Sequence, residues 1–216
     1  MFKKSLVRMF ALALVLPLAG AMAFAQQTRT LNGGFTTVTL SSSFVSALNT
    51  LGVTTGTVNP SELEGGMVSF PVVGGALDLS SAAGNILHSG GLTLTAGSTV
   101  VTLQSFIIDT TSTPEITGLV SVNGKLVGRL PLFDIMLPPG FTTPLMPTGI
   151  MLQLKHVSLT LDFQAAKALD GAFGIGTTLE GSYPSAPVSI GTANVVMFLA
   201  TKKGHGPFYG SYSGRY

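Results

Sequence analysis

Residues 118–130, GLVSVNGKLVGRL, contain the clearest fold signal of this chain. Apolar and polar residues alternate up to Asn123-Gly124, with Val120 and Val122 on one face. Asn-Gly is the pair that two-residue type I′ turns prefer, because both central residues of that turn take a positive φ angle. The segment therefore predicts a β-hairpin, and the two strands that a short hairpin joins pair in the antiparallel sense.

Turn signals of a similar kind recur along the rest of the chain. Gly65-Gly66, Gly74-Gly75 and Gly90-Gly91 separate short runs that are rich in β-branched residues, such as 92–95 and 100–103. The sequence shows no regular alternation of strand and helix patterns, which would indicate a parallel sheet. It therefore predicts an all-β protein, either an antiparallel sandwich or a flattened barrel.

Two of the expected strands are irregular. In the run that ends at Ile108, the apolar face changes sides near Gln104-Ser105, which predicts a β-bulge. In the run 151–161, Lys155-His156 interrupts the alternation and predicts a bend. Both irregularities are expected inside long strands rather than between strands.

Two segments predict short helices instead. Phe44, Leu48 and Leu51 share one helical face, and a similar spacing recurs from Ala165 to Leu169. Each segment follows a strand, begins after Ser or Asp and ends at Gly, as helix caps prefer. The two segments echo each other, but the sequence between them does not align. A repeated way of ending a strand is therefore favoured over an ancient duplication.

The first 25 residues have the pattern of a secretory signal peptide. Lys3, Lys4 and Arg8 precede an apolar run that is too short for a membrane span, and Ala23-Phe24-Ala25 has the small-x-small pattern of a cleavage site. We therefore expect the protein to be exported and cut after residue 25. Its final location is then secreted, periplasmic or on the cell surface.

The processed chain is expected to divide into a β-rich domain, 26–200, and a flexible tail, 201–216, that is rich in Gly, Ser and Tyr. Loss of the three basic residues of the leader leaves eight Lys and Arg against nine Asp and Glu, so the net charge is close to −1. A nearly neutral chain without Trp is a poor partner for nucleic acid. No later stretch of sequence is apolar enough for a transmembrane helix.

Composition also narrows the chemistry. The chain has no cysteine, which excludes disulfides, thiolate metal sites and a cysteine nucleophile. Its three histidines, His88, His156 and His205, lack the spacing of a metal site, and no serine-nucleophile motif is present. A carbohydrate-active enzyme would need two of the nine carboxylates to face each other across a cleft. Ordinary roles in turns and caps explain these carboxylates, so we predict a non-catalytic protein without a metal.

Most of the chain, about residues 35–200, resembles a known family, and two stretches show it best. Residues 65–78, GGMVSFPVVGGALD, and 84–94, GNILHSGGLTL, are similar to the core of HtaA-type domains of exported and cell-surface bacterial proteins. The resemblance implies a β-rich extracellular module, which in some members captures and transfers haem. It also implies that a tyrosinate binds the haem iron, supported by the histidine that corresponds to His88. This chain has no tyrosine between Gln26 and Ser182, so the ligand expected near Phe44 is missing.

We therefore predict an exported binding or structural module of the HtaA-like type, whose partner is an unknown surface or a small hydrophobic ligand. The alternative is a carrier of haem or of another hydrophobic ligand, with His88 near the pocket and Phe44, Phe70 and Phe106 as its apolar walls. In the simpler interpretation of His88, its ring bridges backbone groups in the Gly-rich turn.

Overall fold

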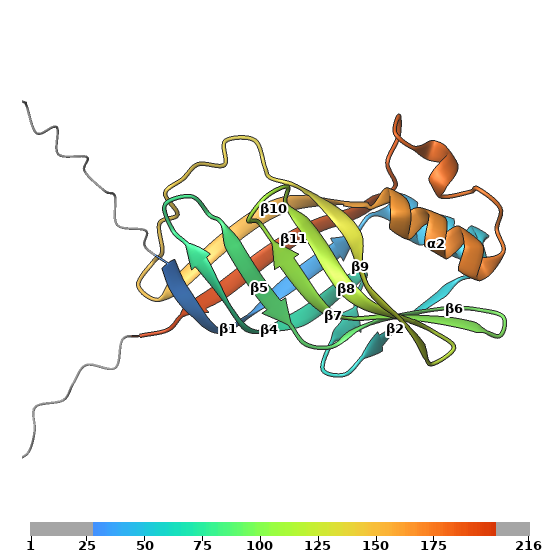
Figure 1. The fold of residues 1–216 in the computed structure, drawn as a ribbon, viewed down its shortest axis with the longest axis horizontal. Coiled ribbons are helices and arrows are strands. Elements are labelled where there is room, and N and C mark those ends of the chain that lie inside the picture. The colour runs from blue at the N-terminus through green and yellow to red at the C-terminus, as the bar shows by residue number, and fades with distance from the viewer. Residues whose placement is uncertain (1–27, 202–216) are drawn as a thin grey trace, which may run out of the picture.

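The computed structural model describes residues 28–201 (Figure 1). The predicted leader, and all of the predicted tail except Thr201, lie outside the described residues. Two α-helices are present in the described part, α1 (Ser42–Thr50) and α2 (Phe163–Phe173), together with a 3-10 turn at Glu180–Ser182. The strands are β1 (Thr28–Leu40), β2 (Thr54–Val58), β3 (Glu62–Glu64), β4 (Met67–Asp78), β5 (Gly84–His88), β6 (Gly91–Ala96), β7 (Thr99–Asp109), β8 (Glu115–Val122), β9 (Lys125–Met136), β10 (Met151–Leu161) and β11 (Ser189–Leu199).

The sheet closes on itself. Neighbouring strands pair in the order β7-β5-β4-β1-β11-β10-β9-β8, and β8 also pairs with β7, so eight antiparallel strands form a barrel. The predicted all-β fold is confirmed, and of the two predicted architectures it is the barrel that forms. Closure removes the free sheet edges that an open sandwich would leave. Outside the ring, β6 pairs with the first half of β7, β2 pairs with β6, and β3 pairs with the start of β4.

Turn chemistry in the sequence explains the local geometry. Asn123 and Gly124 have φ angles of 49° and 79°, and they join β8 to β9 in the predicted hairpin. Ser105 has a φ of 54°, and the register of β7 against β8 shifts beside it. His156 has a φ of 57°, and the register of β10 against β11 shifts around it. The hairpin, the bulge and the bend predicted from the sequence are therefore all confirmed.

The Gly-Gly pair after β5 is required by close backbone approach. β5 and β6 follow one another along the same edge of β7, and the chain bends between them at Gly90, which has a φ of 78°. A Cβ atom at Gly90 would lie 2.2 Å from the hydroxyl oxygen of Ser61, and one at Gly91 would lie 2.1 Å from the carbonyl oxygen of Leu103. Only glycine fits at these two positions, and the bend leaves His88 as the last residue of β5.

Both helices leave the barrel at one end, from the two strands that flank β11. The hydroxyl of Ser41 accepts from the Phe44 N–H at 3.1 Å and caps α1. The carboxylate of Asp162 accepts from two N–H groups at 2.7 and 3.1 Å and caps α2, which ends at Gly174 with a φ of 65°. Figure 1 shows α2 at the end opposite to the start of β1 and the end of β11. In residues 28–201, neither helix has the length and apolarity needed to cross a membrane.

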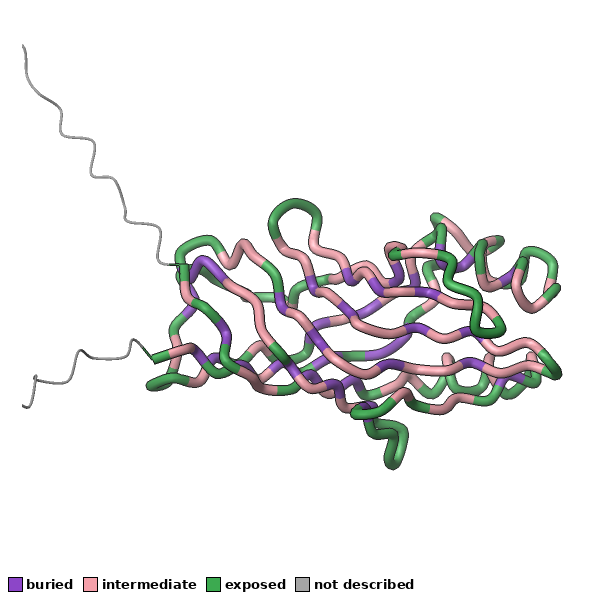
Figure 2. Tube along the Cα trace, turned by 60° about the horizontal axis from the view of Figure 1, so that its bottom comes forward, coloured by how far each residue is buried: buried purple, intermediate pink, exposed green. Residues whose placement is uncertain are grey.

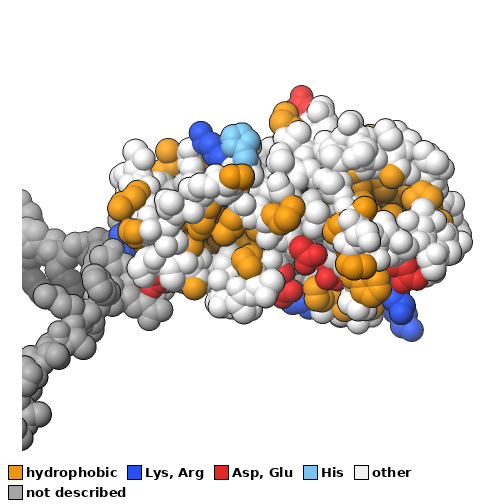
Figure 3. Space-filling model, turned by 90° about the horizontal axis from the view of Figure 1, so that it is seen from above, with side chains coloured by type: hydrophobic (Ala, Val, Ile, Leu, Met, Phe, Trp, Pro, Cys, Tyr) orange, Lys and Arg blue, Asp and Glu red, His pale blue; other side chains and the backbone are white. Residues whose placement is uncertain are grey.

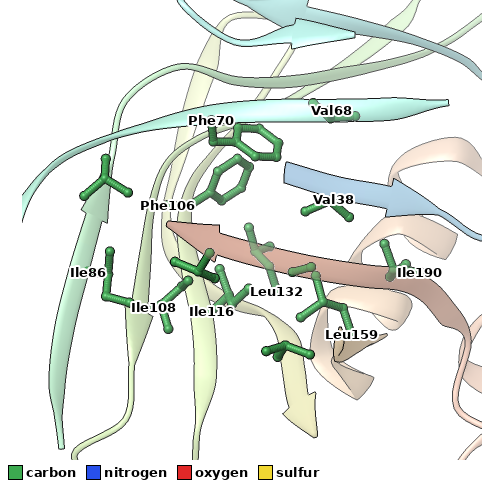
Figure 4. Close-up of a cluster of buried hydrophobic side chains, with 14 of the residues drawn as sticks. Val38, Val68, Phe70, Ile86, Phe106, Ile108, Ile116, Leu132, Leu159 and Ile190 are labelled. Carbon is green, nitrogen blue, oxygen red and sulfur yellow. The ribbon is translucent and has the colours of Figure 1, made fainter. Parts of the chain in front are cut away.

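The core lies inside the barrel. Figure 2 shows buried positions recurring along the strands, as expected when alternate side chains point to the interior. At its centre the rings of Phe70 from β4 and Phe106 from β7 pack edge to face, with centroids 5.1 Å apart and an interplanar angle of 83° (Figure 4). Aromatic pairs prefer this arrangement because the positive ring edge meets the negative ring face. The barrel is therefore filled mostly by its own side chains.

Candidate ligand-binding site

The barrel interior contains one buried polar pair, which joins β1 to β5. The hydroxyl of Thr36 and Nε2 of His88 lie 2.7 Å apart, and the two side chains are only 4% and 5% exposed. Both residues point inward from strands that flank β4. A buried polar group without a partner is costly, so the pairing satisfies one ring nitrogen and one hydroxyl together. The histidine singled out by the sequence is thus a buried core residue whose Nε2 is paired with a threonine hydroxyl.

Burial controls the charge of His88. Desolvation lowers the pKa of its imidazole from 6.5 to about 4, because a charged ring in an apolar interior loses its hydration. Backbone groups of Phe106 and Ile86 lie near the ring and oppose this shift, but Nδ1 makes no hydrogen bond within the described residues. The ring is therefore neutral near pH 7.

A small cavity of about 40 Å³ lies beside this pair. Apolar side chains line the rest of it, including the predicted pocket residues Phe70 and Phe106. Phe44, the third predicted wall, lies on α1 and lines an adjoining space of about 50 Å³ between the helices and the barrel, which shares Leu40 and Phe133 with the first. The structure thus brings His88, Phe70 and Phe106 together and places Phe44 elsewhere.

These residues do not fit haem in this structure. Pockets for drug-sized ligands have volumes of roughly 300–1,000 Å³, far above the 40 Å³ beside His88. Nε2 of His88, which would have to face the iron, is paired with Thr36. Tyr183, the first tyrosine of the chain, donates its hydroxyl to the carbonyl of Leu161. The role of His88 as a haem ligand stays a prediction.

A larger cavity opens at the other end of the barrel, opposite the helices. It has a volume of about 230 Å³. Its floor is formed by buried apolar residues, among them Ile86, which is 1% exposed, and Ala193, which is 2% exposed. A hollow of similar size, about 250 Å³, lies between α1 and β2, but the exposed residues Val45 and Asn49 line it. The first of these two spaces lies inside the barrel, and we call it the loop-end cavity.

Three connecting segments form the mouth of the loop-end cavity. They are the β4–β5 turn, the β7–β8 turn and the β9–β10 loop, which contribute Ser81, Ser112 and Leu137 to its lining. The β7–β8 turn is tied to the β4–β5 turn, because the hydroxyl of Thr110 donates to the carbonyl of Ala82 at 2.6 Å. The mouth therefore combines a few hydroxyl groups with an apolar interior, the usual composition of a small-molecule site.

The β9–β10 loop, residues 137–150, covers part of this mouth. The N–H of Leu145 donates to the carbonyl of Leu79 at 2.5 Å, and its side chain is 6% exposed. Phe141 also lines the cavity. Connections of this length without regular structure are uncommon and are usually functional. Sequence reasoning missed this loop as part of a site, although its Phe and Leu residues among prolines and glycines were a signal.

Several carboxylates lie near one another, since Glu115 pairs with Asp109 on β7 and with Asp134 on β9 in the strand register. Asp134 on β9 has its pKa raised by burial and by the nearby charge of Asp162. A glycosidase would need such a pair to face a groove, but Asp162 caps α2 and neither residue lines a cavity described above. Asp170, which is 2% exposed, accepts from the N–H groups of Leu179 and Glu180. Asp162 and Asp170 therefore have structural roles.

The surface around the site is weakly charged. Figure 3 shows one face of the molecule, on which charged side chains are sparse and hydrophobic side chains gather in hollows. The fold and the site together define a class: a closed antiparallel barrel with two short helices at one end and an apolar cavity that opens at the other.

The comparison with known proteins agrees with this class. No family model and no curated protein matches the chain. The C-terminal domain of HtaA from Corynebacterium glutamicum superposes with a TM-score of 0.57 at 12% sequence identity, covering 80% of this chain and 99% of that one. A domain-swapped dimer of a histidine-to-alanine variant of the same domain gives a TM-score of 0.48 at 15% identity, over 71% and 90% of the two chains. The first match shows a shared fold, so the resemblance to HtaA-type domains is confirmed at that level.

Proposed function

We propose that this protein is an exported, non-catalytic module that binds a small apolar molecule in the loop-end cavity. The observation that supports the proposal is the cavity itself, a space of about 230 Å³ that reaches from an exposed mouth to fully buried residues. Close-packed protein interiors leave few voids larger than a water molecule. A void of this size at the end of an otherwise filled barrel therefore needs an explanation, and ligand binding supplies one.

Cavity volume limits the size of the ligand. An engineered cavity of roughly 150 Å³ lined by similar side chains binds benzene, and drug-sized ligands need roughly 300 Å³ or more. The loop-end cavity, at about 230 Å³, lies between these values. The proposed ligand is thus a single substituted ring or a short hydrocarbon chain.

Export is proposed from the sequence pattern alone. The leader 1–25, with its basic start and its Ala23-Phe24-Ala25 site, directs the chain out of the cytoplasm. The β-rich domain 26–200, with the tail 201–216 after it in the sequence, then acts in the periplasm, on the cell surface or as a secreted protein. A module in that location meets small apolar molecules before they reach the cell, which agrees with a role in capture.

A cavity-filling variant tests the proposal. Toluene is titrated into the mature protein and its binding is measured by calorimetry. Ala193→Leu adds a branched side chain to the cavity floor, so we expect binding to weaken about tenfold or more. Ala47→Leu, next to the separate space under α1, is the matched control and should bind as the unmodified protein does. Urea unfolding checks that both variants fold. Absence of toluene binding, or equal binding by all three proteins, would contradict the proposal.

A further inference from the structure

The loop-end cavity is the first of three spaces that follow one another along the barrel. The second is the space of about 40 Å³ beside His88, which we call the central cavity, and the third is the space of about 50 Å³ beneath the helices. On β10, Leu154 lines the loop-end cavity, Leu159 lines both this and the central cavity, and Leu161 lines the space beneath the helices. The lining residues of β4 and β7 show the same order. Because the strands run between the two ends of the barrel (Figure 1), the three spaces lie in a row from the mouth toward the helices.

A single layer of aliphatic side chains separates the loop-end cavity from the central cavity. Ile108 on β7, Ile116 on β8 and Leu159 on β10 line both spaces, and all three belong to the barrel interior (Figure 4). Each side chain therefore has empty space on two sides, where its atoms lack the dispersion contacts of a filled core. Side chains of a protein interior change rotamer even though they are closely packed on average. A rotamer change in this layer joins the two cavities, and a ligand that fills them restores the missing contacts.

The central cavity suits the apolar end of a ligand. Its lining is aliphatic or aromatic except for Thr36 and His88, whose hydroxyl and Nε2 are already paired at 2.7 Å. No charged side chain of residues 28–201 lines it, and the ring of His88 is neutral near pH 7 because burial lowers its pKa to about 4. A charged ligand group would lose its hydration there without meeting an opposite charge, whereas a methyl end would lose nothing.

We infer that the ligand is an unbranched hydrocarbon chain whose far end passes the layer of Ile108, Ile116 and Leu159 into the central cavity. The inference rests on the proposed function and selects a linear chain over a single ring. Benzene in a cavity of roughly 150 Å³ occupies roughly 25 Å³ per carbon, so the loop-end cavity alone holds about nine carbons and the central cavity adds about two. A ring does not fit the central cavity, which has only about 40 Å³, but a chain along the barrel axis can use both spaces.

A series of alkan-1-ols tests the inference. Hexan-1-ol, nonan-1-ol and undecan-1-ol are titrated into the mature protein and their binding is measured by calorimetry. Each added methylene that leaves water should raise the affinity about fourfold. We expect this increase to continue from nonan-1-ol to undecan-1-ol, because the last two carbons enter the central cavity.

Substitutions of Val38 test where the chain ends. Val38 on β1 lines the central cavity and neither of the other two spaces. Val38→Leu fills part of the central cavity, so undecan-1-ol should bind about tenfold more weakly, whereas hexan-1-ol should bind as before. Val38→Ala enlarges the same space and should not weaken the binding of undecan-1-ol. Val101→Leu is the matched control, because Val101 is 2% exposed and lines none of the three spaces. It should leave the affinities of both alcohols unchanged.

The outcomes distinguish the two proposals. If toluene and hexan-1-ol both fail to bind, the proposed function is wrong. If both bind but undecan-1-ol binds no tighter than nonan-1-ol, the loop-end cavity is a ligand site and the inference about a chain in the central cavity is overturned. Equal weakening of hexan-1-ol and undecan-1-ol by Val38→Leu would also overturn it, because the substitution would then act on the whole barrel. Urea unfolding checks that the variants fold, and the chain-length series of the unmodified protein decides the question if Val38→Leu does not.

Discussion

Acid should destabilise this barrel through His88. Burial lowers the pKa of the imidazole to about 4 in the folded protein, whereas in the unfolded chain its pKa is near 6.5. The unfolded chain therefore binds the proton first, and the free energy of unfolding falls as the pH falls from 6.5 toward 4. The stability that depends on a neutral His88 is complete above pH 6.5 and is lost across this window.

The magnitude follows from the difference between the two pKa values. A change from 6.5 to about 4 corresponds to about 3 kcal/mol in total, of which about 2.5 kcal/mol is lost between pH 7 and pH 4.5. No other titratable side chain lines the cavity beside His88 within the described residues. For a domain of this size such a loss is a large fraction of the usual 5–15 kcal/mol of stability.

Urea unfolding, followed by far-UV circular dichroism at several pH values, measures the effect in the mature protein. His88→Gln is the comparison, because a glutamine can still hydrogen-bond to the Thr36 hydroxyl but does not titrate. The carboxylates titrate in both proteins, so the difference between the two pH curves isolates the histidine. We expect the curves to diverge by about 2.5 kcal/mol between pH 7 and pH 4.5. Parallel curves would refute the reasoning.

Two further predictions concern haem and the cap of α2. Haemin added to the mature protein should keep the absorption spectrum of free haemin, because His88 is enclosed and paired with Thr36. A Soret shift that His88→Ala abolishes would show instead that the barrel opens to admit haem. Asp162→Ala should cost about 1 kcal/mol in urea unfolding, since the Gln164 and Ala165 N–H groups lose their acceptor. Asp162→Asn, which keeps a capping oxygen, should cost much less, and equal losses for both variants would contradict the capping role.

The turns and the caps could be predicted from the sequence because each depends on neighbouring residues. A type I′ turn needs two positive φ angles in succession, and Asn123-Gly124 supplies them whatever the rest of the chain does. The cap at Asp162 depends likewise on two N–H groups within three residues. The leader over residues 1–25 also depends on a local pattern, but it stays a prediction. The resemblance to HtaA-type domains also predicted the correct fold, through short motifs around Phe70 and His88.

Only the tertiary structure decided what the barrel encloses. Thr36 and His88 are 52 residues apart, and their contact exists because β4 lies between β1 and β5. The loop-end cavity is lined by residues from Leu77 to Val195, so its shape is whatever space those distant side chains leave when the sheet closes. The alternation of apolar and polar residues indicates which side chains point inward, but it does not indicate how completely those side chains fill the interior.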